Sequence, residues 1–202
     1  NGVTSSSMRQ KGVAYKLNFG LVIQQIKDIA RHYNADAGLA NAWWKEDVRE
    51  LKILATMLYP ISAFTEKEAD VWVKEIPNQE IREQVCANLF QNLSYANKLI
   101  SDWENSKEDD IRTTSYWLLA RLSLLKTLGS MPINGFTYIF DDIISSDIFL
   151  RNAAILALKH IGRQSKGERY IILEKLAGFK DEEDPLKREI YDSLSFEFEY
   201  YQ

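Results

Sequence analysis

The stretch Ile81-Arg82-Glu83 decides the fold, because close copies of it return along the chain at an almost regular interval. Each copy has an apolar, a basic and a polar residue at the start of a segment with helical periodicity. The basic residues stand at positions 49, 82, 112, 151 and 187, at intervals of 33, 30, 39 and 36 residues. The other copies are Val48-Arg49-Glu50, Ile111-Arg112-Thr113, Leu150-Arg151-Asn152 and, more loosely, Leu186-Lys187-Arg188.

A repeat of this length with two helices per unit is typical of HEAT, armadillo and TPR solenoids. No TPR or ankyrin consensus is present, which favours the HEAT-like type. We find no run of strict apolar–polar alternation long enough to predict a strand. The sequence therefore predicts an all-α, HEAT-like (ARM-type) superhelical solenoid of about five helix pairs. We expect a single domain over residues 15–202, preceded by a flexible, polar segment over residues 1–14.

Local signals predict where the helices begin and end. Thr65 and Glu68 form a capping box, in which each side chain satisfies a free backbone N–H group at a helix start. Gly129, Gly162 and Gly178 follow apolar helical stretches, as C-terminal caps do. We predict helices over residues 19–33, 36–45, 46–59, 65–76, 78–92, 94–105, 108–127, 133–145, 147–162, 165–178 and 184–199.

Composition limits the classes of function. The chain has 202 residues, of which 46% are apolar and 27% charged, so it is typical of a globular protein that buries a core. No apolar run approaches the ~20 residues that span a bilayer. The chain has one cysteine, Cys86, which excludes an internal disulfide. One cysteine and two histidines do not by themselves form a Cys/His zinc site. We expect no metal and no cofactor, no membrane partner, and a cytoplasmic location.

The basic row has two interpretations, which the spacing leaves open. Stacking of the repeats would place one basic residue per unit on a shared curved surface, where the row can follow a phosphate backbone. Alternatively, each arginine pairs with an acid of an adjacent repeat, for which Glu50, Glu83 and Asp110 are available. The net charge of −4 excludes a surface that is positive throughout, but not a basic stripe.

Several further segments make the sequence similar to the DNA alkylation repair enzyme family of HEAT-like alkylpurine DNA glycosylases. They are Leu39-Ala40 with Trp43-Trp44, residues 49–55, Trp72, residues 78–86, and Trp103 followed by Ser106. The similarity extends from about Tyr15 to about Arg163.

This resemblance implies a concave, positive surface that holds duplex DNA. Active members excise N3- and N7-alkylated purines without placing the damaged base in a pocket. A carboxylate near the deoxyribose stabilises positive charge in the transition state, two tryptophans contact the sugar and backbone, and an arginine binds a phosphate.

Carried over by position, the family's site is only partly present. Its motif, Trp-Asp/Glu-x-x-Asp, falls on residues 79–83. The catalytic carboxylate becomes Glu83, and the preceding tryptophan becomes Gln79. The phosphate-binding arginine position falls on Thr113, beside Arg112, and the second tryptophan falls near Leu156. We therefore predict Glu83 as the catalytic candidate and the following DNA contacts: Arg49, Arg82, Arg112, Thr113, Arg151, Lys187 and Arg188.

Three functions remain open at this point. The chain is an alkylpurine glycosylase with a degenerate site, a non-catalytic relative that binds distorted duplex DNA, or a HEAT-like scaffold that binds a protein partner. The sequence contains no phosphate-binding loop, no Gly-rich dinucleotide motif and no Ser/His/Asp arrangement.

Overall fold

The computed structural model describes residues 15–200, and all regular structure in this range is helical. One isolated parallel β-bridge joins Leu17 to Val48. The all-α prediction is therefore confirmed for the described residues. The predicted flexible segment, residues 1–14, lies outside them. The described residues fall into two compact units that divide between Leu93 and Ser94, and the prediction of one domain over residues 15–202 stays a prediction.

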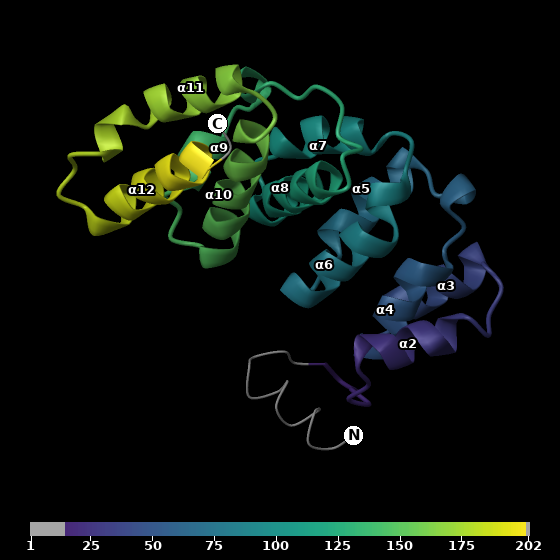
Figure 1. The fold of residues 1–202 in the computed structure, drawn as a ribbon. Helices are drawn as coiled ribbons and strands as arrows, with labels where there is room; N and C mark the ends of the chain where they lie inside the picture. The colour runs from purple at the N-terminus through teal and green to yellow at the C-terminus, as the bar shows by residue number, and fades with distance from the viewer. Residues whose placement is uncertain (1–14, 201–202) are drawn as a thin grey trace. The chain divides into compact units, whose positions relative to one another are not determined.

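The first unit contains five α-helices, α2 to α6, within the described residues (Figure 1). Helix α4 packs against α2, α3 and α6, so it is the central helix of this unit. The helices are α2 (Ile23–Ala30), α3 (Ala37–Lys45), α4 (Arg49–Leu58), α5 (Glu66–Lys74) and α6 (Gln79–Asn88), with 3-10 turns at Ile61–Ala63 and Phe90–Asn92.

An aromatic cluster forms the core between α3 and α5. The indoles of Trp44 and Trp72 are stacked, with ring centroids 4.1 Å apart and planes 4° apart. Tyr59 and Phe64 meet Trp72 edge-on. Such offset and edge contacts add to the burial of the rings themselves. Trp43 points elsewhere and meets Tyr33, so the two adjacent tryptophans serve different contacts.

The second unit contains six α-helices within the described residues (Figure 1). Helix α8 packs against α7 and α10, and α10 in turn contacts α9, α11 and α12. The helices are α7 (Ala96–Glu104), α8 (Asp109–Leu124), α9 (Ile139–Asp142), α10 (Ile148–Gly162), α11 (Lys166–Lys175) and α12 (Pro185–Tyr200), with 3-10 turns at Ile133–Gly135 and Ala177–Phe179.

Most predicted helix boundaries agree with the structure to within a few residues, but two predicted helices are much shorter. In place of 19–33 the helix covers Ile23–Ala30, because the N–H groups of Phe19 and Leu21 bond the carboxylate of Glu50. In place of 133–145 only Ile139–Asp142 is α-helical. There the N–H groups of Thr137 and Tyr138 bond one oxygen of Glu104. In both places a buried carboxylate from a distant segment accepts backbone N–H groups just ahead of the observed helix and holds that stretch outside it.

The end of α10 shows why a glycine stands at position 162. Gly162 is the last helical residue, the cap is Arg163, and the backbone of Gly162 is not left-handed. The sequence-based assignment of Gly162 as a C-terminal cap is therefore wrong. A Cβ atom at Gly162 would overlap the ring of Phe198, which is 3% exposed. The ring of Phe198 on α12 thus packs directly against the backbone of α10 at Gly162.

The substitution Gly162→Ala tests this contact. We expect it to lower the free energy of unfolding by about 2 kcal/mol, because the ring of Phe198 must shift within a packed core. Chemical denaturation followed by circular dichroism measures the change. Gly178→Ala is the matched control, since its Cβ atom would meet no atom within 4 Å. Equal stability of both variants would show that α12 docks in another way.

Two further observations concern side-chain burial and membranes. Cys86, on α6, is fully buried and forms no disulfide bond. Among residues 15–200, none of the helices combines the length and apolar character needed to cross a bilayer.

Candidate nucleic-acid interface

The predicted basic row is only partly in register in the structure, because its fifth member, Lys187, is the third residue of α12 and the matching position is Arg188. Arg82, Arg112, Arg151 and Arg188 are each the fourth residue of their helix, in α6, α8, α10 and α12. Arg49 is the first residue of α4. The repeat thus places a basic residue in the first turn of each helix of this series.

The accessibility of the row rises along the chain. Arg49, Arg82 and Arg112 are buried, with exposed fractions of 1%, 3% and 7%. Arg151 is half-buried and Arg188 is exposed. A guanidinium group must reach solvent to meet a phosphate, so the members of the row are not equivalent as DNA contacts.

Arg49 lies in a network of buried polar groups in the first unit. Its Nε and Nη2 atoms donate to the carboxylate of Glu80 on α6, at 2.8 and 2.6 Å. Its Nη1 donates to Glu50 at 3.2 Å and to the carbonyl of Leu21 at 2.7 Å. Burial alone would lower the pKa of Arg49, but the hydrogen bonds and charges of Glu80 and Glu50 raise it. Arg49 therefore remains charged and ties α4 to α6 and to the segment before α2.

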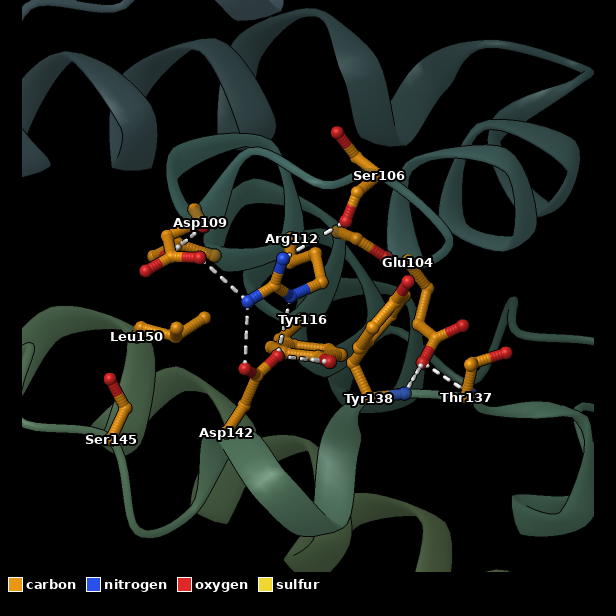
Figure 2. Close-up of polar contacts among 12 residues, drawn as sticks. Glu104, Ser106, Asp109, Arg112, Tyr116, Thr137, Tyr138, Asp142, Ser145 and Leu150 are labelled. Atoms are coloured by element: carbon orange, nitrogen blue, oxygen red, sulfur yellow. Dashed lines mark hydrogen bonds and ion pairs between the residues drawn. The ribbon is translucent and has the colours of Figure 1, made fainter.

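Arg112 has the corresponding role in the second unit (Figure 2). Its Nε and Nη2 atoms donate to the two oxygens of Asp142, at 2.7 and 2.9 Å. Nη2 also donates to Asp109 at 2.7 Å, and Nη1 donates to the carbonyl of Ser106 at 2.9 Å. The ring of Tyr138 lies 4.8 Å from the guanidinium carbon. The hydrogen bond to Asp142 is the main cause of a pKa of Arg112 raised above its ordinary value.

Tyr116 completes this cluster from the next turn of α8. Its hydroxyl donates to Asp142 at 2.8 Å, and the side chain is fully buried. Burial, and then the charge of Asp142, raise the pKa of the phenol, so it stays protonated. Arg112 and Tyr116 together satisfy the buried carboxylate, as a charge in a protein interior requires.

The predicted catalytic carboxylate, Glu83, is half-buried on α6. The amide nitrogen of Gln79 donates to it at 3.1 Å, and the amide oxygen of Gln79 accepts from Arg82 at 2.8 Å. Gln79 therefore bridges an arginine and a carboxylate at the position where the family has an aromatic wall. Whether Glu83 is catalytic stays a prediction.

The remaining carried-over positions are mostly inaccessible. Thr113 is 2% exposed, and its hydroxyl donates to the carbonyl of Asp109 in its own helix. Leu156 is half-buried. Two aromatic residues follow nearby on α8. Tyr116 is fully buried and bonds Asp142, while Trp117 is half-buried.

The accessible cations of the row lie on α10 and α12. Arg151 donates to the carbonyl of Ser145 at 2.8 Å and forms no ion pair with any described residue. Arg188 is exposed, and its guanidinium group bonds no described residue. Lys187 pairs with Glu182 at 3.1 Å.

Sequence reasoning missed Lys159, which is also on α10. Lys159 is half-buried and has no ion pair with a described residue. The spacing of Arg151, Ile155 and Lys159, four residues apart each time, places them on one side of the helix. This four-residue spacing is the sequence signal that could have identified Lys159 as a neighbour of Arg151.

The described residues contain no group of three or more His, Cys, Asp or Glu side chains placed to hold a metal ion.

The fold places this chain among HEAT-like repeat proteins. Its structure matches, with a TM-score of 0.68 and 16% identity, a solved protein of a family described as related to the HEAT-like repeat DNA glycosylases with affinity for branched DNA structures. The match covers 99% of this chain and 89% of that chain. It confirms the HEAT-like fold that the sequence predicts.

The family follows from the sequence. The profile of the DNA alkylation repair enzyme family matches residues 4–166, so the chain belongs to this family. The resemblance drawn from the quoted segments is thereby confirmed. No curated protein sequence matches the chain significantly.

The substitution Asp142→Asn tests whether the Arg112 cluster is structural. Arg112 would remain charged and buried with one acid partner fewer, so we expect a loss of about 3 kcal/mol in the free energy of unfolding. Urea denaturation measures it. Asp102→Asn is the control, because the Lys98–Asp102 pair is exposed and such pairs contribute only ~0–1 kcal/mol. A loss for Asp142→Asn no larger than that of the control would contradict the structural role.

Proposed function

We propose that this protein binds duplex DNA, with a preference for branched or distorted forms, and excises alkylated purines poorly if at all. Membership of the DNA alkylation repair enzyme family supports a DNA ligand. The structurally similar protein comes from a family described as having affinity for branched DNA structures, which supports this preference.

The observation that carries the proposal is the contact between Gln79 and Glu83. Where the family has a flat aromatic surface, this chain has an amide, which donates to the carboxylate predicted to stabilise the transition state. A carboxylate held by a neutral donor is a weaker partner for developing positive charge on the sugar. The family's two aromatic contacts are missing, because Gln79 and Leu156 stand at their positions. Stacking of a base on an aromatic side chain, a comparable contact, contributes ~1–3 kcal/mol to binding.

We place the DNA contacts on the accessible part of the basic row. Arg151 and Lys159 on α10 and Arg188 on α12 have no ion pair with a described residue, so they can exchange water for phosphate. Arg49 is paired with the half-buried Glu80 and Arg112 with the buried Asp142, and in our proposal these pairs stabilise the repeats. Thr113, buried and bonded within its own helix, is given no contact with DNA in this proposal.

DNA binding is tested with the double substitution Arg151→Ala and Arg188→Ala. We expect affinity for a four-way junction at moderate salt to fall about tenfold or more, and the slope of log affinity against log salt to decrease by roughly 2. Fluorescence anisotropy measures both. The control replaces Lys67 and Lys180, two exposed lysines without an ion pair to a described residue, by alanine. An identical loss in the control, or no binding of any DNA at low salt, would refute the proposal.

Excision is tested on DNA treated with a methylating agent, by measuring release of 3-methyladenine and 7-methylguanine. We expect release near the uncatalysed level, unchanged in Glu83→Gln. The substitution Gln79→Trp should raise release, because it restores the aromatic surface and frees the carboxylate. Robust release by the natural sequence that disappears in Glu83→Gln would show instead that the protein is a glycosylase.

A second function is favoured by the same buried ion pairs. Because Arg49 and Arg112 are neutralised within the fold and the net charge is −4, the protein also fits a HEAT-like scaffold for a protein partner. Absence of DNA binding at low salt would leave this function as the better candidate.

A further inference from the structure

The second unit has a groove that the functional site above does not use. It lies where α8 and α10 end and α11 begins, and its volume is about 710 Å³. This volume is within the ~300–1,000 Å³ of typical small-ligand pockets. All its lining residues belong to the second unit, and those that carry the argument are Ser123, Leu124, Lys126, Leu128, His160 and Ser165.

Two polar side chains in the wall of the groove have no protein partner. The imidazole of His160 is 5% exposed and makes no hydrogen bond to any described residue. The hydroxyl oxygen of Ser123 is buried and also lacks a hydrogen-bond partner. Buried polar groups are normally satisfied, so the hydroxyl of Ser123 and the imidazole of His160 offer hydrogen-bonding capacity to a molecule in the groove.

The chemistry of His160 favours a ligand edge that has both a donor and an acceptor. Burial, and then the charge of Arg163, lower the pKa of the imidazole to about 4, so the ring is neutral at physiological pH. A neutral imidazole has one N–H donor and one acceptor nitrogen. The exposed edges of nucleobases present such mixed groups, whereas a phosphate presents acceptors only.

The rim of the groove is suited to a phosphate. Lys126 is exposed, has a positive φ of 56°, and forms no ion pair with a described residue. Helix α11 begins at the rim after its cap, Ser165, and the N–H groups of Lys166 and Gly167 have no acceptor among the described residues. A helix N-terminus with free N–H groups favours an anion.

Among the residues that line the groove, Glu168 is the one acid. Glu168 accepts the backbone N–H of Ile133 at 2.9 Å. Arg163 lines the groove and is paired with Glu197. Lys126 is therefore the cation at this rim that has no carboxylate to neutralise it among the described residues.

We propose that this groove binds one unpaired nucleotide of a DNA strand. Its base lies against Leu124 and Leu128 with its edge toward Ser123 and His160, and its phosphate lies between Lys126 and the first turn of α11. The inference rests on the proposed function, because branched DNA supplies such nucleotides where duplex arms meet.

The test compares a plain duplex with the same duplex carrying a single-stranded flap, using fluorescence anisotropy. We expect the flap to raise affinity about tenfold, which is within the range of a stacking contact. Lys126→Glu should abolish this gain and leave plain-duplex affinity nearly unchanged. Lys180→Glu, an exposed lysine of the same unit outside the groove, is the matched control and should keep the gain.

A second pair of variants examines the inner wall. Ser123→Ala and His160→Phe remove the polar groups, and we expect each to reduce the flap gain severalfold. Urea denaturation of both variants separates a loss of binding from a loss of folding. If a variant is unstable, hydrogen exchange of the unsubstituted protein is measured instead, with and without the flap DNA. Groove amides that the flap does not protect count against the inference.

The outcomes distinguish this inference from the proposed function. No binding of duplex, junction or flap at low salt means that the proposed function has failed. Junction binding with no gain from a flap, or an equal effect of Lys126→Glu on every DNA, overturns the inference alone. A further outcome is that a deoxynucleotide monophosphate shifts the NMR resonances of groove residues while a flap gives no gain in affinity. That result would overturn binding of a DNA strand and assign the groove to a free nucleotide.

Discussion

The buried pairing of an arginine in one repeat with a carboxylate in the next is the constraint on which the fold depends. Arg49 bonds Glu80 and Arg112 bonds Asp142, each through two hydrogen bonds. A buried charge is tolerated only when its partner is held at the correct distance. Each pair therefore fixes the position of one helix along its neighbour in the next repeat. The register of the helices therefore depends on polar contacts as well as on apolar packing.

The same constraint explains which parts of the fold the sequence could predict. Apolar periodicity and capping residues were sufficient for most helices, because these signals act within one segment. They failed over residues 19–33 and 133–145, where Glu50 and Glu104 bind backbone N–H groups of a distant segment. The acceptor that sets where the helix begins in these places lies about thirty residues away, and no local pattern reveals it.

Spacing predicted most of the basic residues near the starts of their helices, but not how accessible each side chain is. Spacing predicted Arg82, Arg112 and Arg151 at equivalent points of successive helices, but it gave Lys187 as the fifth member, where the matching position in α12 is Arg188. It could not show that Arg82 and Arg112 are buried while Arg188 is exposed, because burial depends on which repeats follow. The groove beside His160 was beyond sequence reasoning altogether, since its lining comes from the ends of separate helices.

The burial of Cys86 has a practical consequence for labelling the folded protein. It is the only cysteine of the chain and is fully buried, so maleimide reagents have no accessible native target in the folded protein. A cysteine introduced on each unit would then carry a spin label or dye without first removing a native thiol. Distances between such labels, with and without a nucleic acid, would measure how far apart the labelled positions of the two units lie in solution.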